Sequence, residues 1–242
     1  MGPSAPQGDR AGDRRPERPE RPDPRGVPGA SARREHLRRT TKREQQIRTA
    51  HPHLGGVILA LSGEPASTHA WASGAWGEEV VGRVLNGLAG QGVIALHDRR
   101  MPRSRANIDH IVIAPSGVYV IDTKRYRNQR LQRRVDGGVL GTRVEKLIVG
   151  GRDKTTLVDG VITQAARVQR VVRGVGLGHV PMRAMLCFVD ARWPLAGRAF
   201  TVQGIDVVWP QRAAEMLTMP GWVDEGTRQR LSTVLASAFP PA

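Results

Sequence analysis

The sequence lacks several features that would place it in an extracellular or membrane class. Its 242 residues include one cysteine, Cys187, so no disulfide framework can form within the chain. Cys187 lies in the apolar run MLCFV, which favours a buried thiol. No apolar run approaches the roughly 20 residues that span a bilayer, and the N-terminus has no apolar signal core. We therefore expect a soluble, cytoplasmic protein with no membrane partner.

Acidic residues are also scarce relative to basic ones. The chain has 37 Lys and Arg against 22 Asp and Glu, a formal net charge of +15. This balance favours a polyanionic partner, either nucleic acid or an acidic membrane surface. A GC-rich genome would enrich arginine without any such partner, so charge alone does not decide. Residues 1–50 have no amphipathic apolar face, which argues against the membrane surface.

Composition divides the chain near residue 53. Residues 1–50 contain 13 Lys and Arg against 7 Asp and Glu, and RRPERPERPDPRG repeats proline about every third residue. Proline at this density opposes helix and sheet, and few apolar residues remain to form a core. Residues 31–49 have the composition of a polar helix without an apolar face. We expect a disordered, basic, Arg/Pro-rich tail over residues 1–53 and one folded domain over residues 54–242.

Hydrophobic periodicity predicts alternating helices and strands in that domain. In the first helix, residues 74–90, the valines and leucines form one stripe, with Glu78 at its border and Glu79 facing water. Other predicted helices cover residues 157–172, 212–217 and 224–238. Predicted strands cover residues 92–98, 108–113, 118–124, 180–190 and 205–209, with a hairpin in residues 131–151. The order predicts an α/β or α+β fold with a mixed central β-sheet flanked by helices.

Two of these strands contain charged residues where strands usually have none. Asp122 and Lys124 share one face of residues 118–124, because side chains alternate along a strand. If residues 114–117 form the hairpin loop, Ile113 pairs with Val118 and Asp109 falls opposite Asp122. Opposed carboxylates repel, and a divalent cation between them removes that repulsion. A salt-bridged cluster of two aspartates and a lysine is the alternative, and spacing alone does not separate the two.

The residues around these aspartates resemble a known family. They are GAWGE at residues 74–78, NIDH at 107–110 and IDTK at 121–124, followed by Gln164 on the next predicted helix. This set is similar to the nuclease-related domain, NERD, which is placed in the restriction-endonuclease-like PD-(D/E)XK superfamily. The similarity covers a motif core at residues 72–170 and extends to about residue 210. It implies a restriction-endonuclease-like core within the predicted α/β fold.

The resemblance also implies a role for each motif residue. Asp109 and Asp122, with help from Glu78, would hold Mg²⁺ or Mn²⁺, and Lys124 would position or activate the attacking water. Gln164 would orient Lys124 or the substrate. His110 points to the opposite face from Asp109 and is expected to be a packing residue. These expectations describe a metal-dependent nuclease acting on nucleic acid, with DNA preferred to RNA.

Basic residues flank the motif on both sides. Such side chains bind phosphates without sequence preference and with strong salt dependence. A solvated basic rim is the alternative. The expected phosphate contacts are Arg99, Arg100, Arg103, Arg105, Arg125, Arg127 and Arg130.

A different functional class remains open beside the nuclease. The chain would then be a nucleic-acid-binding module that keeps the nuclease-like fold but does not cut. A Glu78 side chain directed away from Asp109, or a salt bridge closing Lys124 onto Asp122, would favour this alternative. The sequence does not determine whether the nucleic acid is single or double stranded, or whether it is cut internally or from an end. It also leaves the sequence specificity, the oligomeric state and the biological role open.

Overall fold

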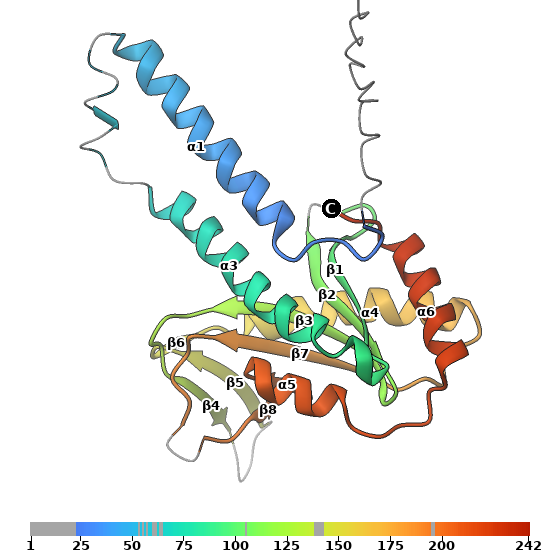
Figure 1. Ribbon diagram of the computed structural model, residues 1–242. Helices are drawn as coiled ribbons and strands as arrows, with labels where there is room; N and C mark the ends of the chain where they lie inside the picture. Colours follow the sequence, from blue (N-terminus) through green and yellow to red (C-terminus); the bar gives the residue numbers. More distant parts are fainter. Residues whose placement is uncertain are drawn as a thin grey trace, which may run out of the picture.

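The computed structural model describes residues 23–242 apart from 53, 55, 57, 60, 61, 63, 64, 105, 138–142, 195 and 196. Within this part a central sheet lies between helices, and a smaller sheet stands at one end of it (Figure 1). The mixed sheet flanked by helices confirms the predicted α/β class. No described helix is both long and apolar enough to cross a membrane.

The central sheet has the order β1-β2-β3-β7-β9-β8. Strands β1, β2 and β3 pair antiparallel, β3, β7 and β9 pair parallel, and β8 is antiparallel to β9. The six strands are β1 (Ile94–Arg100), β2 (Asn107–Ala114), β3 (Gly117–Arg125), β7 (Met182–Val189), β8 (Phe200–Val202) and β9 (Ile205–Val208). The smaller sheet consists of β4 (Leu131–Asp136), β5 (Val144–Val149) and β6 (Arg152–Asp153).

Helices cover both faces of the central sheet. Those in the described part are α1 (Ala30–Ala50), α3 (Ala66–Asn86), α4 (Thr156–Gly174), α5 (Pro210–Leu217) and α6 (Glu225–Ala238), with a 3₁₀ turn at Ala89–Gln91. One apolar layer joins α3 and α5 to the sheet, and a second joins α4 and α6 to the opposite face. The predicted stripes explain this, because Val81 and Leu85 of α3 and Val161 and Val168 of α4 are fully buried.

The predicted helix and strand positions agree with the structure, and the differences are local. Helix α3 begins at Ala66 rather than at residue 74, and the short strands β6 and β8 were not predicted. Cys187 is buried in β7, as expected. Residue 139, within the expected hairpin of residues 131–151, lies outside the described residues, whereas β4 and β5 pair as that hairpin requires.

The hairpin of β2 and β3 has the predicted register. Ile113 pairs with Val118 and Ala114 with Gly117, so the turn is shorter than expected but the alignment is unchanged. Gly117 has a φ of 140°, and a Cβ there would lie 2.4 Å from the carbonyl oxygen of Pro181. Glycine therefore lets the turn pack closely against the segment that leads into β7.

Helix α1 corrects the expectation of disorder for residues 30–50. It packs along α3 and has Ala32 buried at 5% exposure (Figure 1). The Asp98 carboxylate accepts hydrogen bonds at 2.6 Å from the backbone N–H and the hydroxyl of Ser31, and Arg33 forms an ion pair with Glu79. Polar contacts thus replace the apolar face that the sequence lacks. Residues 1–22 lie outside the described residues, so a tail there stays a prediction, as does the boundary at residue 53.

Candidate active site

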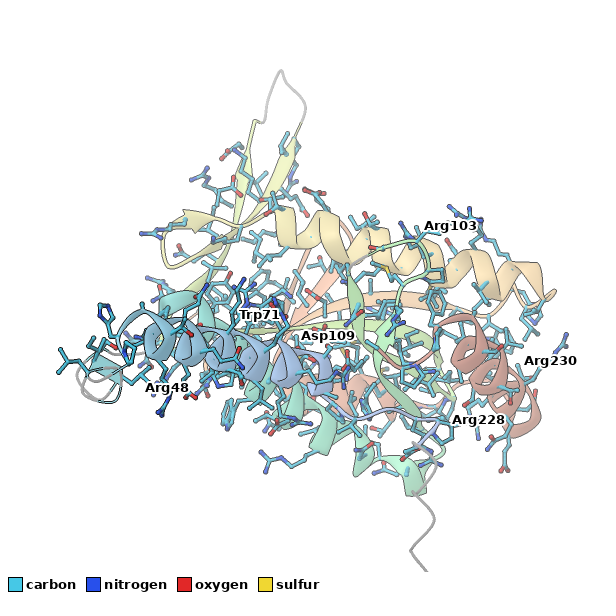
Figure 2. All side chains as sticks on the ribbon, turned by 90° about the horizontal axis from the view of Figure 1, so that it is seen from above. Arg48, Trp71, Arg103, Asp109, Arg228 and Arg230 are labelled. Carbon is cyan, nitrogen blue, oxygen red and sulfur yellow. The ribbon has the colours of Figure 1, made fainter. Side chains whose placement is uncertain are left out.

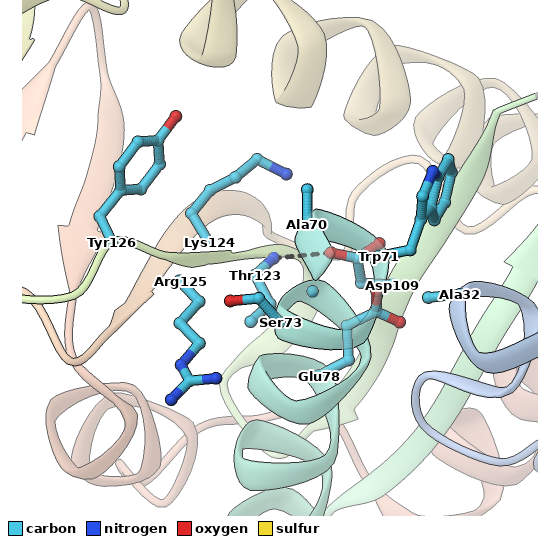
Figure 3. A pocket seen from close by; sticks show the side chains of 11 residues that line it. Ala32, Ala70, Trp71, Ser73, Glu78, Asp109, Thr123, Lys124, Arg125 and Tyr126 are labelled. Carbon is cyan, nitrogen blue, oxygen red and sulfur yellow. Dashed lines mark hydrogen bonds between the residues drawn. The ribbon is translucent and has the colours of Figure 1, made fainter. Parts of the chain in front are cut away.

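A pocket of about 400 Å³ opens where α3 meets the ends of β2 and β3 (Figure 3). Glu78 from α3, Asp109 from β2 and Lys124 from β3 line it together with Thr123. Three of the five predicted catalytic residues therefore reach one space from three different elements. Of the other two, Asp122 pairs directly with Lys124, and Gln164 contacts Asp122.

The strand ladder ends at the pocket. Regular pairing of β2 with β3 stops at His110 and Ile121, one position short of the two aspartates. The Asp109 carboxylate accepts a hydrogen bond of 2.7 Å from the Thr123 backbone N–H, drawn as the dashed line in Figure 3. An acidic side chain thus replaces a backbone carbonyl as partner. Aspartate is disfavoured in the interior of an ordinary strand. Asp109 is accommodated here because its carboxylate accepts the hydrogen bond of the Thr123 N–H that a backbone carbonyl would otherwise accept.

Asp122 is not among the residues that line the pocket and lies between a cation and an amide. Its residue is 6% exposed, and its Oδ2 lies 2.7 Å from Lys124 Nζ. Gln164 of α4 donates from Nε2 to Asp122 Oδ1 at 3.4 Å, while Gln164 Oε1 is buried and has no hydrogen-bond partner in the described part of the chain. The predicted contact of Gln164 with the site is present, and it runs through Asp122 rather than through Lys124.

Glu78 approaches from the helix on the other face of the sheet. As predicted from its position at the border of the apolar stripe, it is partly buried and its carboxyl group turns toward Asp109 (Figure 3). Gly77 precedes it, and a Cβ there would lie 3.3 Å from Arg125 Cβ, so glycine lets α3 lie close to β3. Glu79 was expected to face water and instead pairs with Arg33 of α1.

The carboxyl groups strongly affect one another's protonation. Burial, followed by repulsion from Asp109, raises the pKa of Glu78 to about 9. Burial, followed by repulsion from Asp122, raises the pKa of Asp109 to about 7. Burial acts to lower the pKa of Lys124, but the nearby carboxylates, Asp122 above all, outweigh it and raise that pKa above its usual value. Near neutral pH, Glu78 is therefore protonated and Asp109 is partly protonated when no cation is bound.

The carboxyl groups at the pocket can be compared with the donors that a divalent cation prefers. Oxygen donors from carboxylates suit a hard ion such as Mg²⁺, and burial together with the neighbouring carboxylates raises the pKa values of Glu78 and Asp109 in the absence of an ion. The donors thus fit the ion in kind. They are not gathered into a preformed cage, because no group of three or more His, Cys, Asp or Glu side chains among the described residues is arranged to hold a metal.

Two buried histidines support the pocket from behind. His97 Nε2 lies 2.9 Å from the Asn86 side-chain oxygen, so this nitrogen carries the proton and Nδ1 is the acceptor in neutral His97. His110 Nδ1 then donates to His97 Nδ1 at 2.9 Å, and His110 Nε2 accepts from the Thr123 hydroxyl at 3.2 Å. His110 is fully buried, which confirms the expected packing role. The chain of contacts fixes Thr123, whose N–H holds Asp109.

The basic residues divide into exposed, shielded and buried groups. Arg99 was predicted to contact phosphate, and this is wrong. It is fully buried, and its guanidinium donates to the backbone carbonyls of Pro24, Ala236 and Phe239. A buried cation that holds two distant segments of backbone, at residue 24 and at the end of α6, cannot reach a ligand. The two consecutive arginines, Arg99 and Arg100, gave no sign of this in the sequence, because the burial of Arg99 depends on residues 24 and 236–239, which are distant along the chain.

The remaining arginines stay predictions, with different surroundings. Arg125 lines the pocket, pairs with Asp190 at 2.8 Å and lies 3.9 Å above the Trp76 ring, so its charge is largely engaged. Arg105 lies outside the described residues. The exposed members of the predicted set are Arg100, Arg103, Arg127 and Arg130.

The sequence analysis missed one wall of the pocket. Ala32 of α1 and Ala70 and Trp71 of α3 line it beside the acidic residues. These residues lie outside the recognised motifs, and Ala32 falls in the segment expected to be disordered. The signal that was present is the run of good helix formers in residues 31–49, which predicts a helix even without an apolar face.

The comparisons with known proteins agree with the pocket. Residues 73–189 match the family model of the nuclease-related domain, about half of the chain, and the match contains all five predicted catalytic residues. Neither the curated proteins nor the solved structures yield a match. The family match thus runs from α3 to the end of β7, which are the elements that build the site.

Proposed function

Because residues 73–189 belong to the nuclease-related domain family, we propose that this chain is a metal-dependent nuclease that hydrolyses phosphodiester bonds, with DNA as its substrate. One observation carries the proposal. Glu78, Asp109 and Lys124 come from three elements and converge on one pocket, at the point where two paired strands separate. Residues in a purely structural cluster do not need to line an open space.

Asp109, Asp122 and Glu78 would hold Mg²⁺ or Mn²⁺. When bound, the ion would supply positive charge to the phosphate under attack. The oxygens of these three side chains are the donors that such ions prefer. Burial and the neighbouring carboxylates raise the pKa values of Glu78 and Asp109 in the free protein, which supports this role because a bound ion would favour their ionised forms.

Lys124 and Gln164 would act on the phosphate and the water. The raised pKa of Lys124 keeps its amine protonated at neutral pH, so electrostatic stabilisation of the negative charge that develops on the phosphate suits it better than a role as base. Its side chain is 27% exposed and can reach a ligand in the pocket. The unpartnered oxygen of Gln164 is an acceptor that would orient a water or the lysine.

A nucleic-acid-binding module is the second candidate. The Lys124 amine closes onto Asp122 at 2.7 Å, and the described residues contain no preformed metal cluster, as this alternative requires. Against it, the Glu78 carboxyl faces Asp109 rather than turning away. The two candidates therefore make opposite predictions for metal-dependent cleavage.

Cleavage assays with matched variants separate the candidates. Wild type, Asp122→Ala and Asp159→Asn are incubated with circular plasmid, linear duplex, single-stranded DNA and RNA, with Mg²⁺ or Mn²⁺. Asp159 is an exposed aspartate on α4, the helix that carries Gln164, and serves as the control. The nuclease proposal expects metal-dependent cutting that Asp122→Ala abolishes and Asp159→Asn retains. Binding with steep salt dependence and no cutting by any protein would replace it with the binding module.

A further inference from the structure

The acidic pocket has an aromatic side chain at its mouth. Trp71 of α3 lines the pocket with Asp109 and is 40% exposed, which is unusual for so large an apolar side chain. Figure 3 shows its indole on the side of the pocket away from Arg125 and Tyr126. An exposed indole beside buried carboxylates offers a stacking surface next to a site for phosphate chemistry.

Trp71 is better placed for a ligand than the other aromatic rings near the pocket. The Tyr126 ring packs on Phe188 with centroids 5.8 Å apart, and Trp76 is covered by the Arg125 guanidinium at 3.9 Å. The guanidinium carbon of Arg39 of α1 lies 5.5 Å from the centroid of the Trp71 ring, which is farther than the guanidinium of Arg125 lies from Trp76. Aromatic rings flanked by arginine are the usual platforms for nucleobases in single strands.

Helix α1 gives this side of the pocket a strong positive charge. Its 21 residues contain seven Lys and Arg against two glutamates. Figure 2 shows the helix running past Trp71 and Asp109 and on to Arg48 at its far end. The exposed cations of the helix are Arg34, Arg38, Lys42 and Arg48. Arg38 is paired with Glu35, so Arg34, Lys42 and Arg48 are the charges that a phosphate backbone following the helix would meet.

We propose that the substrate enters as a single strand, which follows α1, stacks one base on Trp71 and places a neighbouring phosphate over the carboxylates. The inference rests on the proposed nuclease function and specifies the substrate form. A base inside a duplex is stacked on its neighbours and has no free face for the indole. The pocket of about 400 Å³ is of the size that holds one small ligand, and Asp109 and Glu78 line it together with Trp71.

Binding measured without cleavage tests this inference directly. Fluorescence anisotropy is recorded in EDTA with a labelled single strand of about 20 nucleotides and with its duplex, since single-strand sites commonly span about 4 to 16 nucleotides. The variants are Trp71→Ala, Trp71→Phe and Trp222→Ala. Trp222 is the matched control, because it is 59% exposed, stacks on His179 and does not line the pocket.

The expected result is specific to the strand form and to the ring. Trp71→Ala should weaken single-strand binding about 5- to 150-fold, the range that the loss of one stacked base gives. Trp71→Phe should recover most of that loss, which shows that the variant protein folds and that the ring matters. Trp222→Ala should bind like wild type, and duplex binding should change little in all variants.

Two outcomes would overturn the inference. One is equal single-strand affinity for Trp71→Ala and wild type, and the other is an equal loss for the duplex. If Trp71→Ala cleaves single strands with metal as fast as wild type does, this would also count against the inference. The nuclease proposal would then still stand. If no cleavage is found but single-strand binding still depends on Trp71, the nuclease proposal fails and the strand-binding surface stands.

Discussion

Replacement of Glu78 by glutamine should make the protein more stable above neutral pH. The Glu78 carboxyl lies beside Asp109 in a pocket that burial and negative charge make unfavourable for a third charge. Glutamine has nearly the same shape but no charge, so it keeps the packing and removes the repulsion. A residue important for activity would then be a residue that lowers stability, as expected where carboxylates are placed to hold an ion.

The sign and size of the effect follow from the pKa values. The pKa of Glu78 is raised from 4.5 to about 9 in the folded state, so the stability that its protonated form provides is lost as pH rises through this interval. Asp109 has a pKa of about 7 and is mostly ionised above that pH. Between about pH 7 and about pH 8.5, the pH dependence of the free energy of unfolding therefore comes mainly from Glu78. At 1.36 kcal/mol per pH unit, the free energy of unfolding falls by about 2 kcal/mol over this interval.

Urea unfolding of wild type and Glu78→Gln across this pH interval measures the difference. The free energy of unfolding of wild type should fall by about 2 kcal/mol in EDTA, whereas that of Glu78→Gln should stay nearly level. Mg²⁺ should stabilise wild type more than the variant. Glu79→Gln is the control on the same helix, because its half-exposed ion pair with Arg33 contributes at most about 1 kcal/mol. Equal pH slopes for wild type and Glu78→Gln would refute the reasoning.

Two further predictions concern buried groups outside the carboxylate cluster. Burial lowers the pKa of His97 to about 4 and also lowers the pKa of its neighbour His110, so in a Glu78→Gln, Asp109→Asn background the free energy of unfolding should fall by at least about 3 kcal/mol as pH drops from 6.5 to about 4. A rise in stability over this interval, measured by urea unfolding, would contradict it. Arg99→Met should destabilise by about 3 kcal/mol or more, because three backbone carbonyls lose a charged donor. Arg100 is exposed, so Arg100→Met should change the free energy of unfolding by less than about 0.5 kcal/mol in thermal unfolding. Equal effects of the two substitutions would contradict the structural role of Arg99.

Much of the domain was predictable because local and global preferences agree there. The alternating residues of β2 and β3 and the Pro-Ser-Gly turn set the register, so the alignment of Ile113 with Val118 followed from the sequence alone. The valine stripes of α3 and α4 identified the faces that cover the sheet. The position of Glu78 at the edge of such a stripe was enough to predict that it reaches the site.

Three features were not predictable for the same physical reason, since each depends on contacts between distant segments. Helix α1 is held by Asp98, 67 residues away from Ser31 along the chain, and by Glu79. The burial of Arg99 depends on carbonyls at both ends of the described chain. Ala32 belongs to the pocket wall only because α1 packs on α3. Composition describes such segments as polar and basic, which is correct, but it contains no information about their partners.

The choice between a structural cluster and a working site depends on which groups are already satisfied. A salt-bridged cluster accounts for Asp122 and Lys124, which pair at 2.7 Å, and the Thr123 N–H accounts for one oxygen of Asp109. It does not account for Glu78, whose carboxyl receives no hydrogen bond from the described residues and has a pKa raised to about 9. It also leaves the buried oxygen of Gln164 without a donor in the described part of the chain. A buried polar atom without a partner is costly, so the Gln164 oxygen and the raised pKa of Glu78 favour a ligand that satisfies these groups over a purely structural role.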